Sequence, residues 1–200
     1  MDITKYEQHD KEPFAACENP EVPSGKWLLA NIPARPTTLL DVGCGTGIHT
    51  RWFNGQGIKA IGITINPDEI NNRVHKNVQY GNMLEIPFND EVFDCVFCLG
   101  TLEHTHAPFV ALCEFNRVLK NDGYLFFDMC GLNCSFILDA RFSYHKSILL
   151  PVQIKDLLLR TGFRIIDGKY TDSVIDNKYY QVKITTGSHY LSKKVETVAL

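Results

Sequence analysis

A short run of glycines after an acid is the part of this sequence best suited to chemistry. Residues 39–42 are apolar apart from Asp41, and Gly43, Gly45 and Gly47 follow at every second position. This order predicts a buried strand, a tight loop and the start of a helix. Because glycine has no Cβ, the loop lets a ligand lie against bare backbone, as in nucleotide sites at the end of a first strand.

The spacing of these glycines argues against a dinucleotide site. Such a site needs Gly-x-Gly-x-x-Gly, with pyrophosphate on the helix N-terminus, and the position of its third glycine is Ile48. The carboxylate of Asp41 would repel a phosphate but suits a cation. The loop therefore favours a ligand-binding site for a molecule with positive charge and no phosphate. The alternatives are a nucleotide site of an oxidoreductase and a plain glycine-rich turn without a ligand.

The run from Asp41 to Gly47 resembles motif I of class I S-adenosylmethionine (SAM)-dependent methyltransferases. Four later segments resemble the same family in the same order: 89–96, 102–104, 114–123 and 161–163. The resemblance covers residues 38–187 and is nearest to small-molecule enzymes of the ubiquinone- and menaquinone-biosynthesis type. It implies SAM as the cofactor and in-line methyl transfer to a small-molecule acceptor.

The resemblance also implies a set of cofactor-binding residues in the loops that follow the first four strands. They are Asp41, Gly43, Cys44, Gly45, Thr46, Gly47, Thr64, Ile65, Glu69, Asn82, Met83, Leu99, Gly100 and His104. The methionine end of the cofactor is expected on the glycine loop, with its ammonium group near Asp41. Asp41 can also be a strand-end acid bonded to nearby backbone N–H groups, and both roles are compatible.

The ribose position departs from the common family pattern. Thr64 stands where most relatives have an acid that accepts from both ribose hydroxyls. The string Gly-Ile-Thr resembles cyclopropane-fatty-acid synthases, in which the Thr and a later Gln share this role, and Glu69 stands at the position of that Gln. Glu69 is also the third residue of a helix capping box that begins at Asn66. Glu69 can therefore contact the ribose or serve only as part of the cap, and both roles remain open. Asp68 is the other candidate for the ribose contact.

The adenine position departs in a similar way. Asn82 stands where relatives usually have an acid, and Met83 follows it. The oxygen of an Asn amide can still accept from the adenine amino group, without the contribution of a full charge. The alternative is that Asn82 caps its own turn.

His104 and His106 are the candidate general bases, because histidine titrates near physiological pH. The alternative for His104 is a structural residue of the loop. The acceptor is expected to lie among the N-terminal arm with Tyr6, residues 102–108 and a lid at 131–150. The sequence lacks the strings typical of enzymes that methylate nucleic-acid bases, so we expect no nucleic-acid partner.

Residues 38–187 alternate between strand and helix patterns, which predicts an α/β sheet covered on both faces. The expected strands are 38–42, 59–65, 77–80, 92–99, 124–129, 163–169 and 179–186, and helices are expected at 27–32, after 47, from 67, from 108 and from 151. With the resemblance, this predicts a Rossmann-like, doubly wound seven-stranded sheet whose last strand is antiparallel. Residues 1–37 are expected to form an arm and helix, and 188–200 a tail.

Composition narrows the other possibilities. The 200 residues carry a net charge of −3, with no basic block, which argues against a nucleic-acid binder but leaves room for a local basic groove. No apolar run approaches the ~20 residues that span a bilayer, and the start of the sequence lacks the apolar core of a signal peptide. The seven cysteines favour reduced thiols in a cytoplasmic protein.

One cysteine pair invites a metal interpretation. Cys95 and Cys98 lie three apart in a predicted strand, so their side chains should point to opposite faces, and we expect no metal site. The sequence is consistent with a monomer or homodimer. The alternative to a methyltransferase is a SAM-binding regulatory or partner subunit without its own catalysis.

Overall fold

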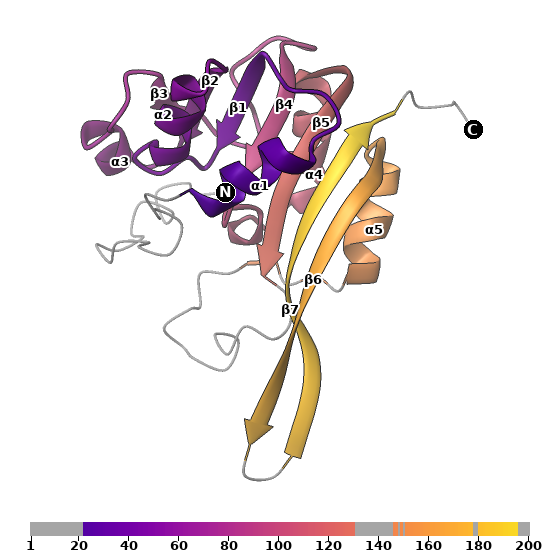
Figure 1. Ribbon diagram of the computed structural model, residues 1–200. Coiled ribbons are helices and arrows are strands. Elements are labelled where there is room, and N and C mark those ends of the chain that lie inside the picture. Colours follow the sequence, from indigo (N-terminus) through magenta and orange to yellow (C-terminus); the bar gives the residue numbers. More distant parts are fainter. Residues whose placement is uncertain (1–21, 131–145, 148, 150, 178–179, 196–200) are drawn as a thin grey trace.

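Seven strands form one mixed sheet with helices on both faces (Figure 1). The computed structural model describes residues 22–130, 146–147, 149, 151–177 and 180–195. The strand order is β3-β2-β1-β4-β5-β7-β6, and β7 runs antiparallel to both of its neighbours while β1 to β5 pair in parallel. The predicted Rossmann-like sheet with an antiparallel last strand is therefore confirmed.

The strands are β1 (Thr38–Val42), β2 (Lys59–Thr64), β3 (Val78–Tyr80), β4 (Phe93–Cys98), β5 (Leu119–Cys130), β6 (Phe163–Asn177) and β7 (Tyr180–Lys194). The helices are α1 (Pro23–Asn31), α2 (Ile48–Gly55), α3 (Pro67–Asn71), the 3₁₀ helix η2 (Leu102–His104), α4 (Pro108–Val118) and α5 (Pro151–Arg160). Parallel neighbours bring the carboxyl ends of β1, β2, β3 and β4 to one edge of the sheet, where their loops meet.

Two apolar clusters, one on each face of the sheet, form the core. One cluster joins α1 and α2 to the sheet through residues such as Leu28, Phe53 and Phe97. The other joins α4 and α5 to the opposite face through residues such as Phe115 and Leu158. The spacing of the apolar residues after Pro108 predicts a buried helix face, and all of its members are buried: Ala111, Leu112, Phe115, Val118 and Leu119. Burial of both faces explains why β4 is almost continuously apolar.

The two cysteines of β4 separate as the strand geometry predicts. Cys95 packs in the cluster under α1 and α2, and Cys98 packs in the cluster under α4 and α5. Both thiols are fully buried. Because the sheet lies between their side chains, the pair cannot bind one metal ion.

Several element boundaries differ from the sequence prediction, and β5 begins at Leu119 rather than at Tyr124. Helix α1 begins at Pro23 rather than at Trp27, because proline at the first helical position needs no hydrogen-bond acceptor for a backbone N–H. Strands β6 and β7 are longer than expected and pair from Phe163↔Lys194 to Asn177↔Tyr180. Residues 188–193, expected as part of a tail, belong to the part of β7 that pairs with β5, where Tyr190, Leu191 and Ser192 are buried.

The buried side of α2 also differs from the prediction. The apolar residues after Gly47 predict that Ile48, Trp52 and Phe53 form the buried side of the helix. Phe53 is buried, but Ile48 and Trp52 are only half-buried, while His49 and Thr50 are enclosed. The hydroxyl of Thr50 donates to the buried Asp41 carboxylate, which turns this side of the helix toward the sheet. A polar contact at the strand end thus prevails over the apolar pattern of the helix.

The β6–β7 hairpin extends well beyond the rest of the sheet (Figure 1). Pairing between β5 and β7 ends at Cys130↔Gly187, and beyond that point the two strands pair with each other. Strand β7 is thus held in the core at one end only, by its pairing with β5.

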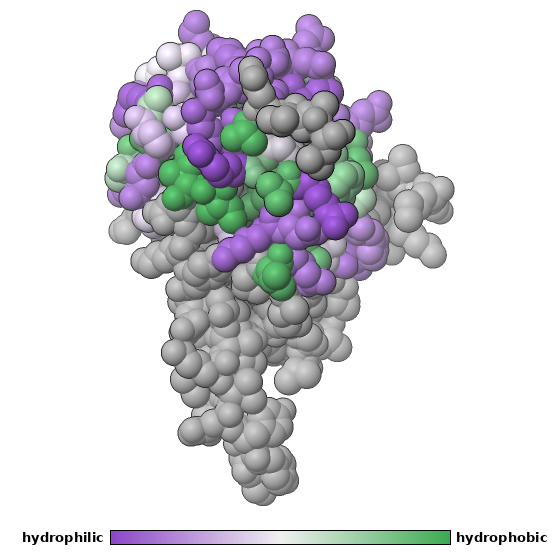
Figure 2. All heavy atoms as spheres, turned by 90° about the vertical axis from the view of Figure 1, so that its right-hand side faces the viewer, coloured by the Kyte–Doolittle hydropathy of each residue, from purple (hydrophilic) through white to green (hydrophobic). Residues whose placement is uncertain are grey.

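Apolar side chains gather on part of the face in Figure 2, bordered by polar ones. The large apolar side chains that α4 and α5 expose are Phe109, Val110, Val152 and Leu159. No helix in the described part of the chain combines the length and apolarity needed to cross a membrane.

Candidate functional site

The loop between β1 and α2 is built from backbone in a conformation that glycine favours. Gly43, Gly45 and Gly47 have φ angles of 68°, 56° and 91°, in the left-handed region that side chains disfavour. A Cβ on Gly43 would lie 2.2 Å from Oγ1 of Thr101, and one on Gly47 would lie 2.3 Å from Val78. The loop is therefore closely packed against the loop after β4 and against β3, and it presents bare backbone.

Asp41, at the end of β1, lies directly under this loop. Its side chain is 2 % exposed, and Oδ2 accepts a 2.7 Å hydrogen bond from the Thr50 hydroxyl. Burial raises the pKa of the carboxyl to about 7, although the hydroxyl and backbone N–H of Thr50 oppose the rise. The structure thus places Asp41 in the role of a strand-end acid that orients α2, which was one of its two expected roles.

Thr64 and Glu69 meet at the end of β2 and the first turn of α3. The Thr64 hydroxyl donates to Oε2 of Glu69 at 2.5 Å and accepts from the backbone N–H of Asn66 at 3.1 Å. Asn66 caps α3 as predicted, because its Oδ1 accepts from the N–H of Asp68. The hydroxyl is therefore a relay that orients the Glu69 carboxylate, while Ile65, directly after β2, is 43 % exposed.

The Cys44 thiol connects these two regions. The backbone N–H groups of Gly43 and Cys44 both donate to the carbonyl of Ile63, the residue before Thr64, and the Cys44 thiol packs against Gly62. Burial raises the pKa of this thiol, and the carboxylates of Asp41 and Glu69 add to the rise. The glycine loop and the Thr64–Glu69 pair therefore adjoin at the ends of β1 and β2.

Asn82 follows β3 on the same edge of the sheet. The N–H of Gly81 donates to the Thr64 carbonyl at 3.0 Å, which ties the two strand ends together. Oδ1 of Asn82 accepts from the N–H of Leu84, and its carbonyl accepts from the N–H of Glu85. The amide thus closes its own turn, and one lone pair of Oδ1 is left for a ligand. Met83 is half-buried against the core.

The loop after β4 contributes Leu99, Gly100 and Thr101. Thr101 donates from Oγ1 to the Leu99 carbonyl at 2.9 Å and packs over Gly43. The N–H of Gly100 donates to Oδ1 of Asp128, in β5, at 2.5 Å. Asp128 and Thr101 therefore both hold this loop in place.

Glu103, in η2, is a buried carboxyl close to Asp128. It is 5 % exposed, and its Oε2 is enclosed without a hydrogen-bond partner among the described residues. Burial, followed by the Asp128 charge, raises the pKa of Glu103 well above its usual range. The N–H groups of Lys146 and Ser147 donate to its backbone carbonyl, so this segment lies against η2.

The two candidate bases differ in exposure. His104 is half-buried at the end of η2, and His106 is exposed. Tyr6, the arm before residue 22 and most of the expected lid at 131–150 lie outside the described residues.

Sequence reasoning missed Thr101, Asp128 and Glu103 as parts of the site. A charged residue inside the apolar run of β5 was the available signal for Asp128, because such a residue needs a partner when the strand is central. Thr101 had no comparable signal, since its contact with Gly43 exists only in the folded chain.

The donor set can hold a ligand with the chemistry of SAM. Bare backbone with Asp41 beneath it suits an ammonium group, the Glu69 carboxylate suits a pair of hydroxyls, and the Asn82 amide suits an amino group. Among the described residues, no group of three or more His, Cys, Asp or Glu side chains could hold a metal ion.

Comparisons with known proteins agree with this arrangement. A family model described as "Methyltransferase domain" matches residues 40–127. A ubiquinone biosynthesis O-methyltransferase of Thiobacillus denitrificans is 28% identical, over 63% of this chain and 59% of that protein. A tRNA U34 carboxymethyltransferase of Aeromonas hydrophila is 29% identical, over 74% of this chain and 53% of its own length.

A solved structure of a SAM-dependent methyltransferase from Archaeoglobus fulgidus matches with a TM-score of 0.70 and 22% identity, covering 92% of this chain and 100% of that chain. At this identity the likeness concerns the fold. The chain spans 57% and 56% of the length of the first two curated relatives that it matches.

Proposed function

Since this chain belongs to the class I SAM-dependent methyltransferases, we propose that it transfers the methyl group of SAM to a small-molecule acceptor by in-line displacement. The observation that carries the proposal is the left-handed glycine loop between β1 and α2, packed against Thr101 with Asp41 beneath it. A loop of bare backbone over a buried acid suits a cationic, phosphate-free ligand.

Each part of the loop edge has a proposed share in holding the cofactor. Gly43, Gly45 and Gly47 carry the methionine end, with Asp41 and the loop carbonyls supplying negative charge for its ammonium group. Cys44 and Thr46 line the same loop, and Thr64 with Ile65 and Glu69 takes the ribose. Asn82 and Met83 take the adenine, while Leu99, Gly100 and His104 border the transferable group.

When bound, SAM supplies a methyl group made electrophilic by its sulfonium. The task of the protein is to align the acceptor with that group and to exclude water, and alignment alone can lower the barrier by roughly 7–11 kcal/mol. The fixed loop 99–101, held by Thr101 and by Asp128, provides one rigid wall for this alignment.

A general base is needed only when the acceptor must lose a proton before it attacks. His104 and His106 are the proposed proton acceptors, and His104 is the better placed because it ends η2 beside the loop. If His104 is the base, His104→Asn should remove the acidic limb of the pH–rate profile, where the imidazole becomes protonated, and His106→Asn should keep that limb. If His106 is the base, the two results are exchanged. An unchanged profile in the His104→Asn enzyme would assign His104 a structural role instead.

A small molecule is the proposed acceptor because of the relatives that carry that chemistry in their names and because the chain has no overall basic character. The tRNA-modifying relatives define the competing class. The chain's free thiols at Cys44, Cys95, Cys98 and Cys113 motivate a cytoplasmic location, which we include in the proposal.

The experiment uses the purified chain with methyl-labelled SAM. Calorimetry should detect SAM binding at micromolar concentration, and label should pass to one fraction of a metabolite extract, with its product identified by mass. Total tRNA is tested in parallel. Label in the tRNA alone overturns the small-molecule acceptor, and binding without transfer to any fraction favours the non-catalytic SAM-binding subunit. No binding overturns the proposed function.

A further inference from the structure

An irregular segment connects β3 to β4 and carries the proposed adenine loop. It begins at Gly81 and Asn82, contains one isolated bridge between Asn82 and Glu85, and has no helix or strand until Phe93. A segment of this kind has few backbone partners of its own. Its shape therefore depends on the groups that bind it from outside.

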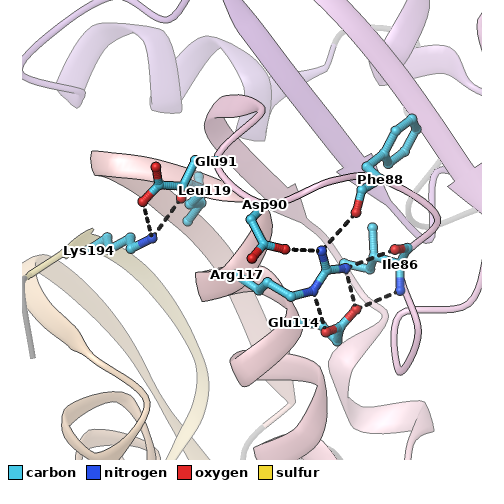
Figure 3. A network of polar contacts seen from close by, with 8 residues as sticks. All are labelled: Ile86, Phe88, Asp90, Glu91, Glu114, Arg117, Leu119 and Lys194. Carbon is cyan, nitrogen blue, oxygen red and sulfur yellow. Dashed lines mark hydrogen bonds and ion pairs between the residues drawn. The ribbon is translucent and has the colours of Figure 1, made fainter.

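The end of α4 supplies those groups (Figure 3). The guanidinium of Arg117 donates to the carbonyls of Ile86 and Phe88 at 2.9 and 2.8 Å. It also binds Glu114 in a bidentate manner and the carboxylate of Asp90 at 2.8 Å. Glu114 in turn accepts from the backbone N–H of Ile86 at 2.8 Å. We call Glu114 and Arg117 the α4 clamp.

The α4 clamp acts on the residue next to the Asn82 turn. The turn closes when the carbonyl of Asn82 accepts from the N–H of Glu85, and Ile86 is the next residue. Both backbone groups of Ile86 are bound by the clamp, and its side chain is buried in the core with only 3 % exposed. A shift of Ile86 would therefore shift Glu85 and open the turn that orients Asn82.

We propose that Glu114 and Arg117 are positioning residues for the adenine end of the cofactor site. This inference rests on the proposed function, because it assumes that the Asn82 side chain recognises the adenine base of the cofactor. The α4 clamp would then act on recognition through Asn82. The clamp does not touch the ligand. It sets the position of the one amide oxygen that distinguishes an amino group from a carbonyl on the base.

The geometry of the clamp explains the choice of residue types. A guanidinium presents several N–H donors in one plane, so it reaches two carbonyls and a carboxylate at once, whereas a lysine ammonium is a single point charge. The Glu114 and Arg117 side chains are 19% and 30% exposed, while Asp90 is 72% exposed. Contacts with Glu114 and the two carbonyls are therefore the better shielded part of the network.

The experiment measures base discrimination by calorimetry. The two probes are S-adenosylhomocysteine and its inosine counterpart, which carries a carbonyl in place of the amino group. We expect wild-type protein to prefer the adenine probe by about tenfold, the discrimination of one hydrogen bond. Arg117→Lys and Glu114→Gln should each lower this preference to about twofold while the protein stays folded by circular dichroism.

A double-mutant cycle separates positioning from general destabilisation. Asn82→Ala should abolish the preference, and adding Arg117→Lys should lower it no further, because both changes act through the same amide. The matched control is Lys194→Met, which removes the contacts of Lys194 with the Leu119 carbonyl and with Glu91 beyond Asp90. This control should lower the melting temperature and keep the full preference.

The outcomes divide clearly. If wild-type protein binds neither probe, the proposed function is overturned. If it binds both probes equally, or if Arg117→Lys and Glu114→Gln keep the wild-type preference, the positioning role alone is overturned. If Arg117→Lys does not fold, the Glu114→Gln variant and its cycle with Asn82→Ala decide the matter.

Discussion

The two ends of the proposed cofactor site differ in the groups that form them: backbone at the methionine end and side chains at the adenosine end. At the methionine end, the loop from Gly43 to Gly47 is a backbone surface whose left-handed glycines touch Thr101 and Val78. At the adenosine end, the Glu69 carboxylate and the Asn82 amide are held by hydrogen bonds from Thr64 and from Leu84.

This difference explains which end departs from the family pattern. A Cβ on Gly43 or Gly47 would lie 2.2 or 2.3 Å from its nearest neighbour, far inside van der Waals contact, so substitution there is disfavoured by sterics as well as by φ. A hydrogen-bonding role can be supplied by different side chains in different positions. The sequence therefore keeps the glycine string and varies at Thr64 and Asn82.

The largest expected effect is that of Gly43→Ala. Left-handed strain and overpacking against Thr101 cost about 1–3 kcal/mol each, so the free energy of unfolding should fall by about 4 kcal/mol. SAM binding should be lost. Chemical denaturation and calorimetry measure both quantities.

Two other glycines serve as controls for this variant. Gly57 has a positive φ of 82°, whereas Gly55 is not among the glycines with positive φ. A Cβ on either residue would meet nothing within 4 Å. Gly57→Ala should cost about 1 kcal/mol through strain alone, and Gly55→Ala should be neutral or slightly stabilising. Equal costs at Gly43 and Gly57 would contradict the role given to packing against Thr101.

The next effect concerns the charge beneath the loop. Burial raises the pKa of Asp41 to about 7 in the folded chain, from an unfolded value near 4. The folded state therefore binds this proton more tightly, and the resulting stabilisation is complete below pH 4 and is lost as the pH rises through 7. Relative to Asp41→Asn, wild-type protein should lose about 4 kcal/mol of stability over this range, at ~1.4 kcal/mol for each pKa unit.

Urea denaturation between pH 4 and pH 8 measures the difference between the two proteins. Asparagine keeps an oxygen that can accept from Thr50, so its contribution should be independent of pH. Parallel stability curves for the two proteins would show that Asp41 does not titrate in this range. The buried charge would then not distinguish the methionine end of the site from the adenosine end.

A smaller effect is expected at the ribose position. Thr64→Val removes the hydroxyl that joins the N–H of Asn66 to the Glu69 carboxylate, at nearly constant volume. The affinity for S-adenosylhomocysteine should fall by about tenfold, which corresponds to ~1.4 kcal/mol. Thr64→Ser keeps the hydroxyl and should bind like wild type. If Val and Ser bind equally, the hydroxyl relay has no part in ribose binding.

The smallest effect should have the opposite sign. Asn82→Asp restores a full charge at the adenine position and still accepts from the N–H of Leu84, so binding of S-adenosylhomocysteine should tighten by about fivefold. Calorimetry at pH 7.5 compares it with Asn82→Ala, which should bind more weakly than wild type. Weaker binding by the Asp variant would place the adenine amino group away from this side chain.

Much of the fold was predictable because it follows from local patterns. The apolar runs of β1 and β4, the caps of α3 and the buried face of α4 all lie where periodicity and turn residues place them. The length of β7 was not predictable, because residues 188–193 owe their strand conformation to pairing with β5, far away in the sequence.

The candidate site shows the same division. By itself, the sequence determined the glycine loop, the acid before it and the cap of α3, because backbone sterics and local hydrogen bonds act between near neighbours. Only the tertiary structure decided that Thr101 closes over Gly43, that Asp128 binds Gly100 and that Arg117 holds the segment behind Asn82. The partners in these contacts are 28 to 58 residues apart in the sequence, so no local sequence pattern predicts them. They meet because the folded sheet brings the loops at its edge together.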